Sequence, residues 1–261
     1  MTLSVNTNTT ASSSARMLNI NHAQLQRSLT KLSTGKRINA PSDDAGGLAV
    51  SMKMSAAIRR NSAVQNNVSN AIAFLQTQDG AMATYGAILE RMSELKMLHQ
   101  DITKNATDKA NYNTEYGQLK SQLGNLIAET FNSVALFGTA SPGAVAITED
   151  GGQKVTLTAI GLTAPAADTL TALTVTVITN AISTVATKRA INGASSNRLQ
   201  YALDMLSINK VNLEAANGRI LDADIASEST EFAKLQILSQ ANSAMLSQAN
   251  TLPQAALRLI G

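Results

Sequence analysis

Apolar side chains recur at helical spacing near both ends of the chain. Near the amino terminus, leucines stand seven, four and three residues apart, on one face of a helix expected from about Ser14 to Leu32. Near the carboxyl terminus, Leu238, Met245 and Leu252 stand seven apart, with Leu235 beside the same stripe. The pattern predicts one amphipathic helix at each end. Because neither helix could bury its stripe alone, we expect both to need partners from elsewhere.

Longer helical patterns fill most of the remaining chain. Apolar residues recur at threes, fours and sevens from about Leu48 to His99, and a second helix is expected from about Thr114 to Glu129 after a polar break. In the second half, heptad spacing returns and runs to Ile220. These patterns predict antiparallel helices that pack through coiled-coil-like seams.

The segment between the two helical halves has a different pattern. AVAIT and KVTLT alternate apolar and polar residues on either side of Glu149-Asp150-Gly151-Gly152. Alternation on both sides of an Asp-Gly pair is typical of two strands joined by a tight turn. We therefore expect one small β-hairpin here.

Composition and charge narrow the function classes. The chain has no Cys and no Trp, only 3% aromatic residues and 44% hydrophobic residues, which favours helices over a sandwich or barrel and excludes disulfides. A net charge of +3 without a basic cluster argues against nucleic-acid binding. No apolar run approaches the ~20 residues needed for membrane insertion, and the amino terminus lacks signal-peptide features. If the protein leaves the cell, we expect another export route.

Few residues are candidates for catalysis or for metal binding. Asp43 and Asp44 could form a carboxylate pair for acid–base chemistry or metal binding, but adjacent carboxylates at the start of a helix more often cap it. The histidines, His22 and His99, stand outside any metal-ligand spacing, and no Gly-rich phosphate loop is present. We expect no enzyme activity, no cofactor and no metal.

Two long segments resemble one protein family. SLTKLSTGKRINAPSDDAGGLAVSMKM resembles the amino-terminal signature of bacterial flagellins, and ANGRILDADIASESTEFAKLQILSQANSAMLSQANTLPQAALRLIG resembles their carboxyl-terminal region. The resemblance covers roughly the first 137 residues and the last 85. Only the hairpin region is unmatched, and it is too short for the outer domains of larger flagellins.

The resemblance implies a mainly α, elongated antiparallel helical bundle or coiled-coil rod, with terminal helices in an inner core domain and one small β-hairpin. It implies a structural subunit that is exported unfolded by the flagellar type III apparatus, polymerises at the filament tip and enables swimming. The expected segments are an inner-core helix (1–33), a connector (34–47), rod helices (48–137), a hairpin and variable region (138–175), a rod return helix (176–221) and a second inner-core helix (222–261).

The resemblance also implies site residues and partners. The inner-core assembly residues are expected to be Leu18, Leu25, Leu29, Leu32, Leu235, Leu238, Met245 and Leu252. In the connector, Lys36 and Arg37 are candidates for contacts with neighbouring subunits. The expected partners are further copies of the chain in a helical homopolymer, an export chaperone, the filament cap and the hook–filament junction proteins. The expected location is secreted, in the extracellular filament.

A surface read by innate immune receptors of animal hosts is a further candidate. LERMSELKML resembles that surface, with Arg91 and Leu95 at matching positions, and Glu115 matches a third. Glu90, Ser93 and Lys96 depart from the pattern. The alternative is that the three matching residues only pack rods together.

Other identities stay open at this point. An ordinary intramolecular bundle would account for the apolar stripes alone. A hook–filament junction protein shares the terminal helices, a secreted adhesin or receptor ligand would need a binding site on the hairpin, and a filament-borne enzyme would need catalytic spacings.

Overall fold

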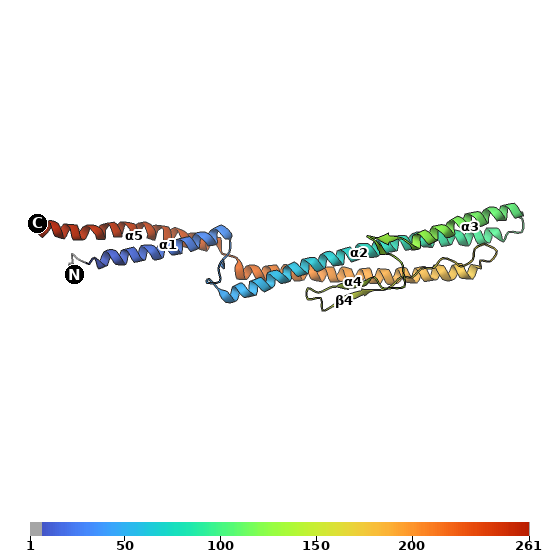
Figure 1. Ribbon diagram of the computed structural model, residues 1–261, viewed down its shortest axis with the longest axis horizontal. Helices are drawn as coiled ribbons and strands as arrows, with labels where there is room; N and C mark the ends of the chain where they lie inside the picture. Colours follow the sequence, from blue (N-terminus) through green and yellow to red (C-terminus); the bar gives the residue numbers. More distant parts are fainter. Residues whose placement is uncertain (1–6, 261) are drawn as a thin grey trace. The chain divides into compact units, whose positions relative to one another are not determined.

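The computed structural model describes residues 7–260, with side chains as far as residue 251. Within this range the chain is mainly α, as predicted, with short antiparallel strand pairs (Figure 1). The helices are α1 (Thr9–Thr34), α2 (Ala45–His99), α3 (Ala106–Ile127), α4 (Val175–Leu221) and α5 (Ile225–Ile260). The strands are β1 (Thr130–Phe131), β2 (Val134–Ala135), β3 (Gly143–Ala146) and β4 (Lys154–Leu157).

The chain divides into two compact units. The terminal unit contains the chain up to Ala56 together with the chain from Leu213 onward, and the central unit contains Ala57–Asn212. Helices α2 and α4 therefore contribute residues to both units. Each unit has its own packing, described separately below.

The central unit is built on a heptad seam. On α4, the buried positions Ile178, Val185, Asn192, Leu199 and Leu206 stand seven residues apart. On α2, Met82, Leu89 and Leu95 are fully buried in the same core. The predicted rod stripe is thus the core of this unit, as a knobs-into-holes seam requires.

Helix α3 begins earlier than the apolar pattern predicts. It starts at Ala106 rather than near Thr114. The reason is a capping box: the side chain of Asn105 accepts from the backbone N–H of Asp108, and the Asp108 carboxylate accepts from the backbone N–H of Asn105. This cap satisfies two amide groups that the first turn leaves unpaired, so polar residues that resemble a break extend the helix.

The predicted hairpin is β3–β4, paired antiparallel with Val145 opposite Val155. A second pair, β1–β2, was not predicted. It turns through Asn132 and Ser133, which both have positive φ, as the tight hairpin turn between Phe131 and Val134 requires. Two residues per strand are too few to show alternation, so the apolar pattern carries no signal for this pair.

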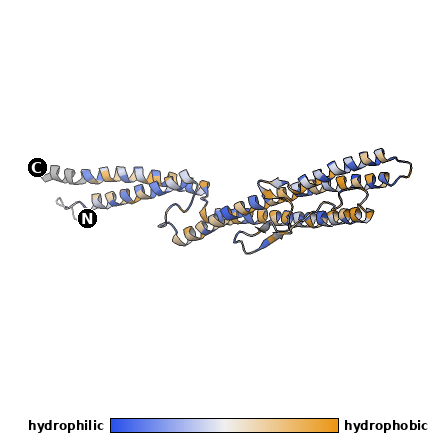
Figure 2. Ribbon diagram, turned by 45° about the vertical axis from the view of Figure 1, so that its right-hand side comes forward, coloured by the Kyte–Doolittle hydropathy of each residue, from blue (hydrophilic) through white to orange (hydrophobic). Residues whose placement is uncertain are grey.

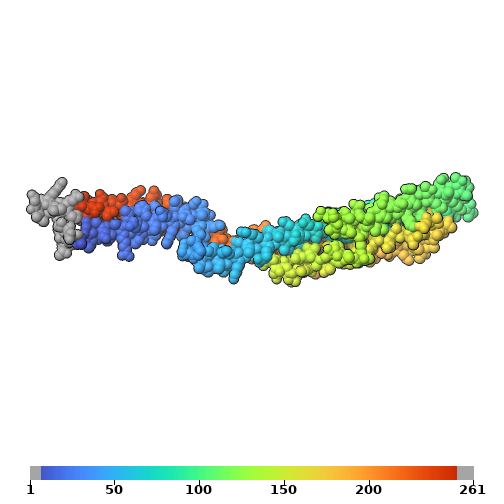
Figure 3. Space-filling view, viewed as in Figure 1, coloured from blue at the N-terminus to red at the C-terminus, as the bar shows by residue number. Residues whose placement is uncertain are grey.

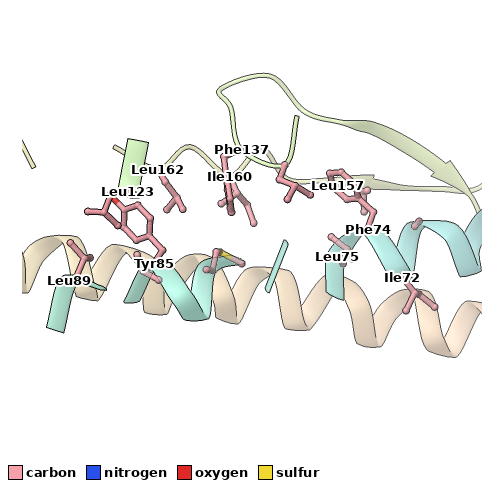
Figure 4. Close-up of a cluster of buried hydrophobic side chains, with 14 of the residues drawn as sticks. Ile72, Phe74, Leu75, Tyr85, Leu89, Leu123, Phe137, Leu157, Ile160 and Leu162 are labelled. Carbon is pink, nitrogen blue, oxygen red and sulfur yellow. The ribbon is translucent and has the colours of Figure 1, made fainter. Parts of the chain in front are cut away.

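The strand region covers the helices of the central unit (Figure 3). Leu157, Ile160 and Leu162 point into the cluster that contains Leu75 and Tyr85 of α2 (Figure 4). Burial raises the pKa of Tyr85 to about 12, and its hydroxyl donates to the carbonyl of Thr163 at 2.9 Å.

Polar side chains fix the segment that follows β4. Tyr116 donates to the carbonyl of Ala167 at 2.8 Å, and the buried Lys96 ammonium donates to the carbonyl of Leu170 at 2.7 Å. The central unit therefore buries its large side chains and also satisfies the backbone of its covering segment.

Candidate functional site

The terminal unit pairs α1 with α5 side by side (Figure 1). The pairing is antiparallel, because Asn8 donates to the carbonyl of Ala249 at 2.8 Å while Lys31 lies 3.5 Å from the Glu228 carboxylate at the other end. Apolar and polar residues alternate at short intervals along both helices (Figure 2). The contact between the two helices therefore includes both apolar and polar side chains.

The seam between α1 and α5 contains few large apolar side chains. Leu235, Ser28 and Ala249 are buried, whereas Leu18, Leu25 and Leu32 are half-buried. His22 and Ser239 face each other across the pair at 3.4 Å. A seam of this kind buries little apolar area and stabilises the pair weakly.

Several large apolar side chains of the pair face outward. Of the predicted assembly residues, Leu29 is 55% exposed, Leu238 39% and Met245 62%. Met17, Ile20 and Ile237 are also exposed and were not predicted. The sequence shows that these three residues are apolar. They lie off the predicted stripes, so the heptad spacing did not select them.

The predicted assembly residues on the two terminal helices therefore divide into two sets. Leu18, Leu25, Leu32 and Leu235 lie in the intrachain seam, whereas Leu29, Leu238 and Met245 lie outside it. Leu238 follows the buried Leu235 by three residues, which places it about 60° around the helix. Heptad spacing identifies a stripe, but it does not say which stripe meets the partner helix. The side chain of Leu252 lies outside the described residues.

The connector after α1 is fixed within the chain. Gly35 ends α1 in the left-handed conformation with φ 68°, which a residue with a Cβ adopts only under strain. The backbone N–H of Arg37 donates to the carbonyl of Leu221 at 2.6 Å, and its guanidinium donates to the carbonyl of Ile220 at 2.9 Å. These carbonyls end α4, where a cation is favourable, so Arg37 acts as a cap for that helix. Beside it, Lys36 forms a backbone bridge with Asp222.

Asp44 caps the start of α2, whereas Asp43 binds the backbone of the connector that precedes it. Asp43 Oδ2 accepts from the backbone N–H groups of Ala40 and Asn39, both at 3.0 Å, and these bonds hold the pKa of Asp43 below its usual value. Asp44 Oδ1 accepts from the backbone N–H of Gly47 at 2.8 Å at the start of α2. Both carboxylates therefore bind backbone amides. Across the described residues, no group of three or more acidic or histidine side chains could hold a metal ion.

The candidate receptor surface is only partly exposed. Leu95 is fully buried in the core of the central unit, so the prediction that it forms part of an accessible surface is wrong in this structure. Arg91 donates to Glu115 at 2.8 Å and to Glu94 at 2.6 Å, and these two carboxylates raise the pKa of Arg91. Leu95 belongs to the heptad seam of α2, whose apolar positions turn inward. The Arg91–Glu115 pair ties α2 to α3.

Within the described residues, none of the helices is long and apolar enough to cross a membrane.

Family models and sequence relatives match nearly the whole chain. The family model for the bacterial flagellin N-terminal helical region matches residues 5–140, and that for the C-terminal helical region matches residues 175–260. The chain is 37% identical to a flagellin of Halalkalibacterium halodurans and 33% identical to a flagellin of Bacillus subtilis, in both cases over 98% of this chain and 99% of the relative. A crystal structure of Bacillus cereus flagellin matches at 28% identity with a TM-score of 0.46, over 58% of this chain and 94% of that one.

Two family models match in the expected order, and the relatives align over nearly their full length. Together they establish the protein family of the terminal helices and of the central unit. The chain is a member of the bacterial flagellin family, a structural subunit that polymerises into the flagellar filament and not an enzyme.

Proposed function

We propose that the outward faces of α1 and α5 carry the main contacts of the polymer. The observation that supports this is the exposure of Leu29, Ile237 and Met245 on a helix pair whose own seam is small and partly polar. In an isolated subunit these side chains would remain in water. Covering them with neighbouring copies recovers about 25 cal/mol for each Å² of apolar surface.

This arrangement also accounts for growth without closure. A contact between two different surfaces of the same chain, repeated from copy to copy, extends into a filament when the rotation does not close a ring. The outward faces of α1 and of α5 are two such surfaces, because Leu29 and Met245 lie on different helices.

Family membership supports the rest of the assembly route as a proposal. The chain is exported through the flagellar type III apparatus, keeps its amino-terminal region and is added to an extracellular filament. An export chaperone, the filament cap and the hook–filament junction proteins are its transient partners. Mass spectrometry of subunits from culture medium tests this, because a mature chain that begins beyond Leu32 would have lost α1.

Arg91 and Glu115 remain candidates for contact with a host receptor, since both side chains are 41% exposed. We propose that their first role is the tie between α2 and α3. A receptor reporter assay with Arg91→Ala and Glu115→Ala filaments tests recognition separately from assembly.

Electron microscopy of the purified chain, seeded with short filament fragments, tests the main proposal. We expect long filaments whose formation depends on protein concentration. A chain that stays monomeric under seeding, although circular dichroism shows it to be helical, would contradict the proposal.

A further inference from the structure

A second exposed apolar surface lies in the central unit. On α4, four large side chains are exposed: Tyr201 (76%), Met205 (59%), Ile208 (58%) and Val211 (60%). They stand four, three and three residues apart, on the face of the helix that points away from the buried Leu199 and Leu206. We call this surface the α4 ridge. The exposed Asp204 lies on the same face, three residues after Tyr201 and four before Ile208. Exposed apolar side chains gathered on one face mark an interaction surface.

The same unit has a groove between α2 and α4. One cavity of about 220 Å³ is lined by the small residues Ala83, Gly86, Ala87 and Ala186, together with larger ones that include Ile182 and Arg189. A second cavity of about 230 Å³ includes Gly193 and Ser196. The ion pair between Asp79 and Arg189 contributes one residue to each cavity, so the two adjoin. We call this surface the small-residue groove.

We propose that the α4 ridge of one copy seats in the small-residue groove of a second copy. The inference rests on the polymerisation described above, which supplies that second copy. From Tyr201 to Val211 the ridge extends about 15 Å along α4, and the groove extends about 21 Å between Ile182 and Ser196, at 1.5 Å for each residue. The ridge is therefore short enough to lie within the groove, where its large side chains would meet Ala83, Gly86, Ala87 and Gly193.

The two surfaces also satisfy the geometry of an open polymer. The groove lies on the side of α4 that adjoins α2, whereas the ridge lies on a face turned away from the seam. Since they are different patches of one chain, their pairing is heterologous, and each copy keeps a free ridge and a free groove for the next. The contact is thus a second one, built by the central unit.

Cysteine cross-linking tests the pairing directly, because the chain contains no Cys. Met205→Cys or Ile208→Cys on the ridge is combined with Ala83→Cys or Ala87→Cys in the groove. Filaments are assembled under reducing conditions and treated with a short bis-maleimide. The matched control combines Met205→Cys with Ser121→Cys, which is exposed on α3 outside the groove.

We expect at least one ridge–groove pair to give a ladder of covalent multimers, at least tenfold stronger than in the control. Variants that assemble poorly are co-assembled with wild-type chain, where adjacent variants give dimers. Filaments in which all four pairs match the control would overturn this contact alone, as would single ridge variants that cross-link to each other. Failure of the wild-type chain to form filaments would instead overturn the proposed function, and this contact with it.

Discussion

The terminal and central units use the same heptad pattern for different purposes. In the central unit, Met82, Leu89 and Leu95 are fully buried within the chain. In the terminal unit, Leu29 and Met245 are more than half exposed, and the seam between the helices includes Ser28. A periodic apolar stripe therefore identifies a helix that needs a partner, but not whether that partner belongs to the same chain.

This difference implies that the two units depend on different contacts, one within the chain and the other with neighbouring copies. We expect the central unit to fold in an isolated subunit, because its large apolar side chains are buried within the chain. The terminal pair has most to gain from neighbouring copies. We therefore expect its outward side chains to govern assembly and the core of the central unit to govern monomer stability.

The largest effect is expected when a carboxylate is placed on an outward face. Leu238→Asp or Met245→Asp would bury an unpaired charge in the polymer and cost at least ~3 kcal/mol per subunit, roughly a hundredfold in critical concentration. Sedimentation measures the polymer, and circular dichroism checks that the monomer remains helical. Gln236→Asp, at an exposed polar position of α5, is the matched control. Normal filaments from both Asp variants would show that this face lies in solvent.

A matched pair of leucine truncations compares the two units in the monomer. Leu89→Ala removes a fully buried side chain from the central core and is expected to lower the free energy of unfolding by about 2–5 kcal/mol. Leu235→Ala, at a buried position in the seam of the terminal pair, is expected to lower it by less, about 1–2 kcal/mol, because that seam has few large neighbours. Chemical denaturation of verified monomers measures both. Equal losses would remove the distinction between the units.

Two adjacent glycines probe the connector of the terminal unit. A Cβ at Gly47 would lie 2.4 Å from Asp44 Oδ2 and 2.8 Å from Ile38 Cδ1, whereas a Cβ at Gly46 would have only an ordinary contact at 3.6 Å. Gly47→Ala is therefore expected to destabilise the start of α2 by about 1–3 kcal/mol. Gly46→Ala should be neutral or stabilise it by up to about 1 kcal/mol. Thermal unfolding distinguishes them, and an equal Tm for the two variants would refute the close-approach argument.

The smallest effect is expected from acid titration of Asp79. The Arg189 guanidinium donates to this carboxylate at 2.9 and 3.0 Å and holds the pKa of Asp79 below its usual 3.8. Because the folded-state pKa is depressed, the stabilisation is present above the unfolded pKa and is lost as the pH falls through the folded value. Both side chains are more than two-fifths exposed, so the pair contributes less than about 1 kcal/mol. The stability difference between wild type and Asp79→Asn should therefore shrink below about pH 4. A constant difference would argue against the pair.

The sequence predicts the helices better than their orientations. Long stripes and the Asp44 cap predict α1, α2, α4 and α5, since period and capping are local properties. The start of α3 was missed because the capping box at Asn105 lies in a polar segment. The β1–β2 pair is too short to leave a pattern.

In the candidate site, too, the sequence pattern did not predict which way each side chain faces. Leu29 was placed with Leu25 on the amino-terminal stripe, and Leu238 with Leu235 on the carboxyl-terminal stripe, but in each helix the structure leaves one of the two exposed. Leu95 matches a surface motif in the sequence, yet the heptad seam turns it inward. Which side of an amphipathic helix meets its partner depends on neighbours distant in the sequence, and spacing alone does not supply them.

The central claim is that the terminal helix pair obtains its protection from neighbouring copies, whereas the central unit protects itself. Hydrogen–deuterium exchange of the same chain as monomer and as filament tests this directly. We predict fast exchange in 9–34 and 225–251 of the monomer, strong protection of both segments in the filament, and slow exchange around Leu89 and Leu199 in both states. Equal protection of the terminal and central helices in the monomer, unchanged on polymerisation, would contradict the account.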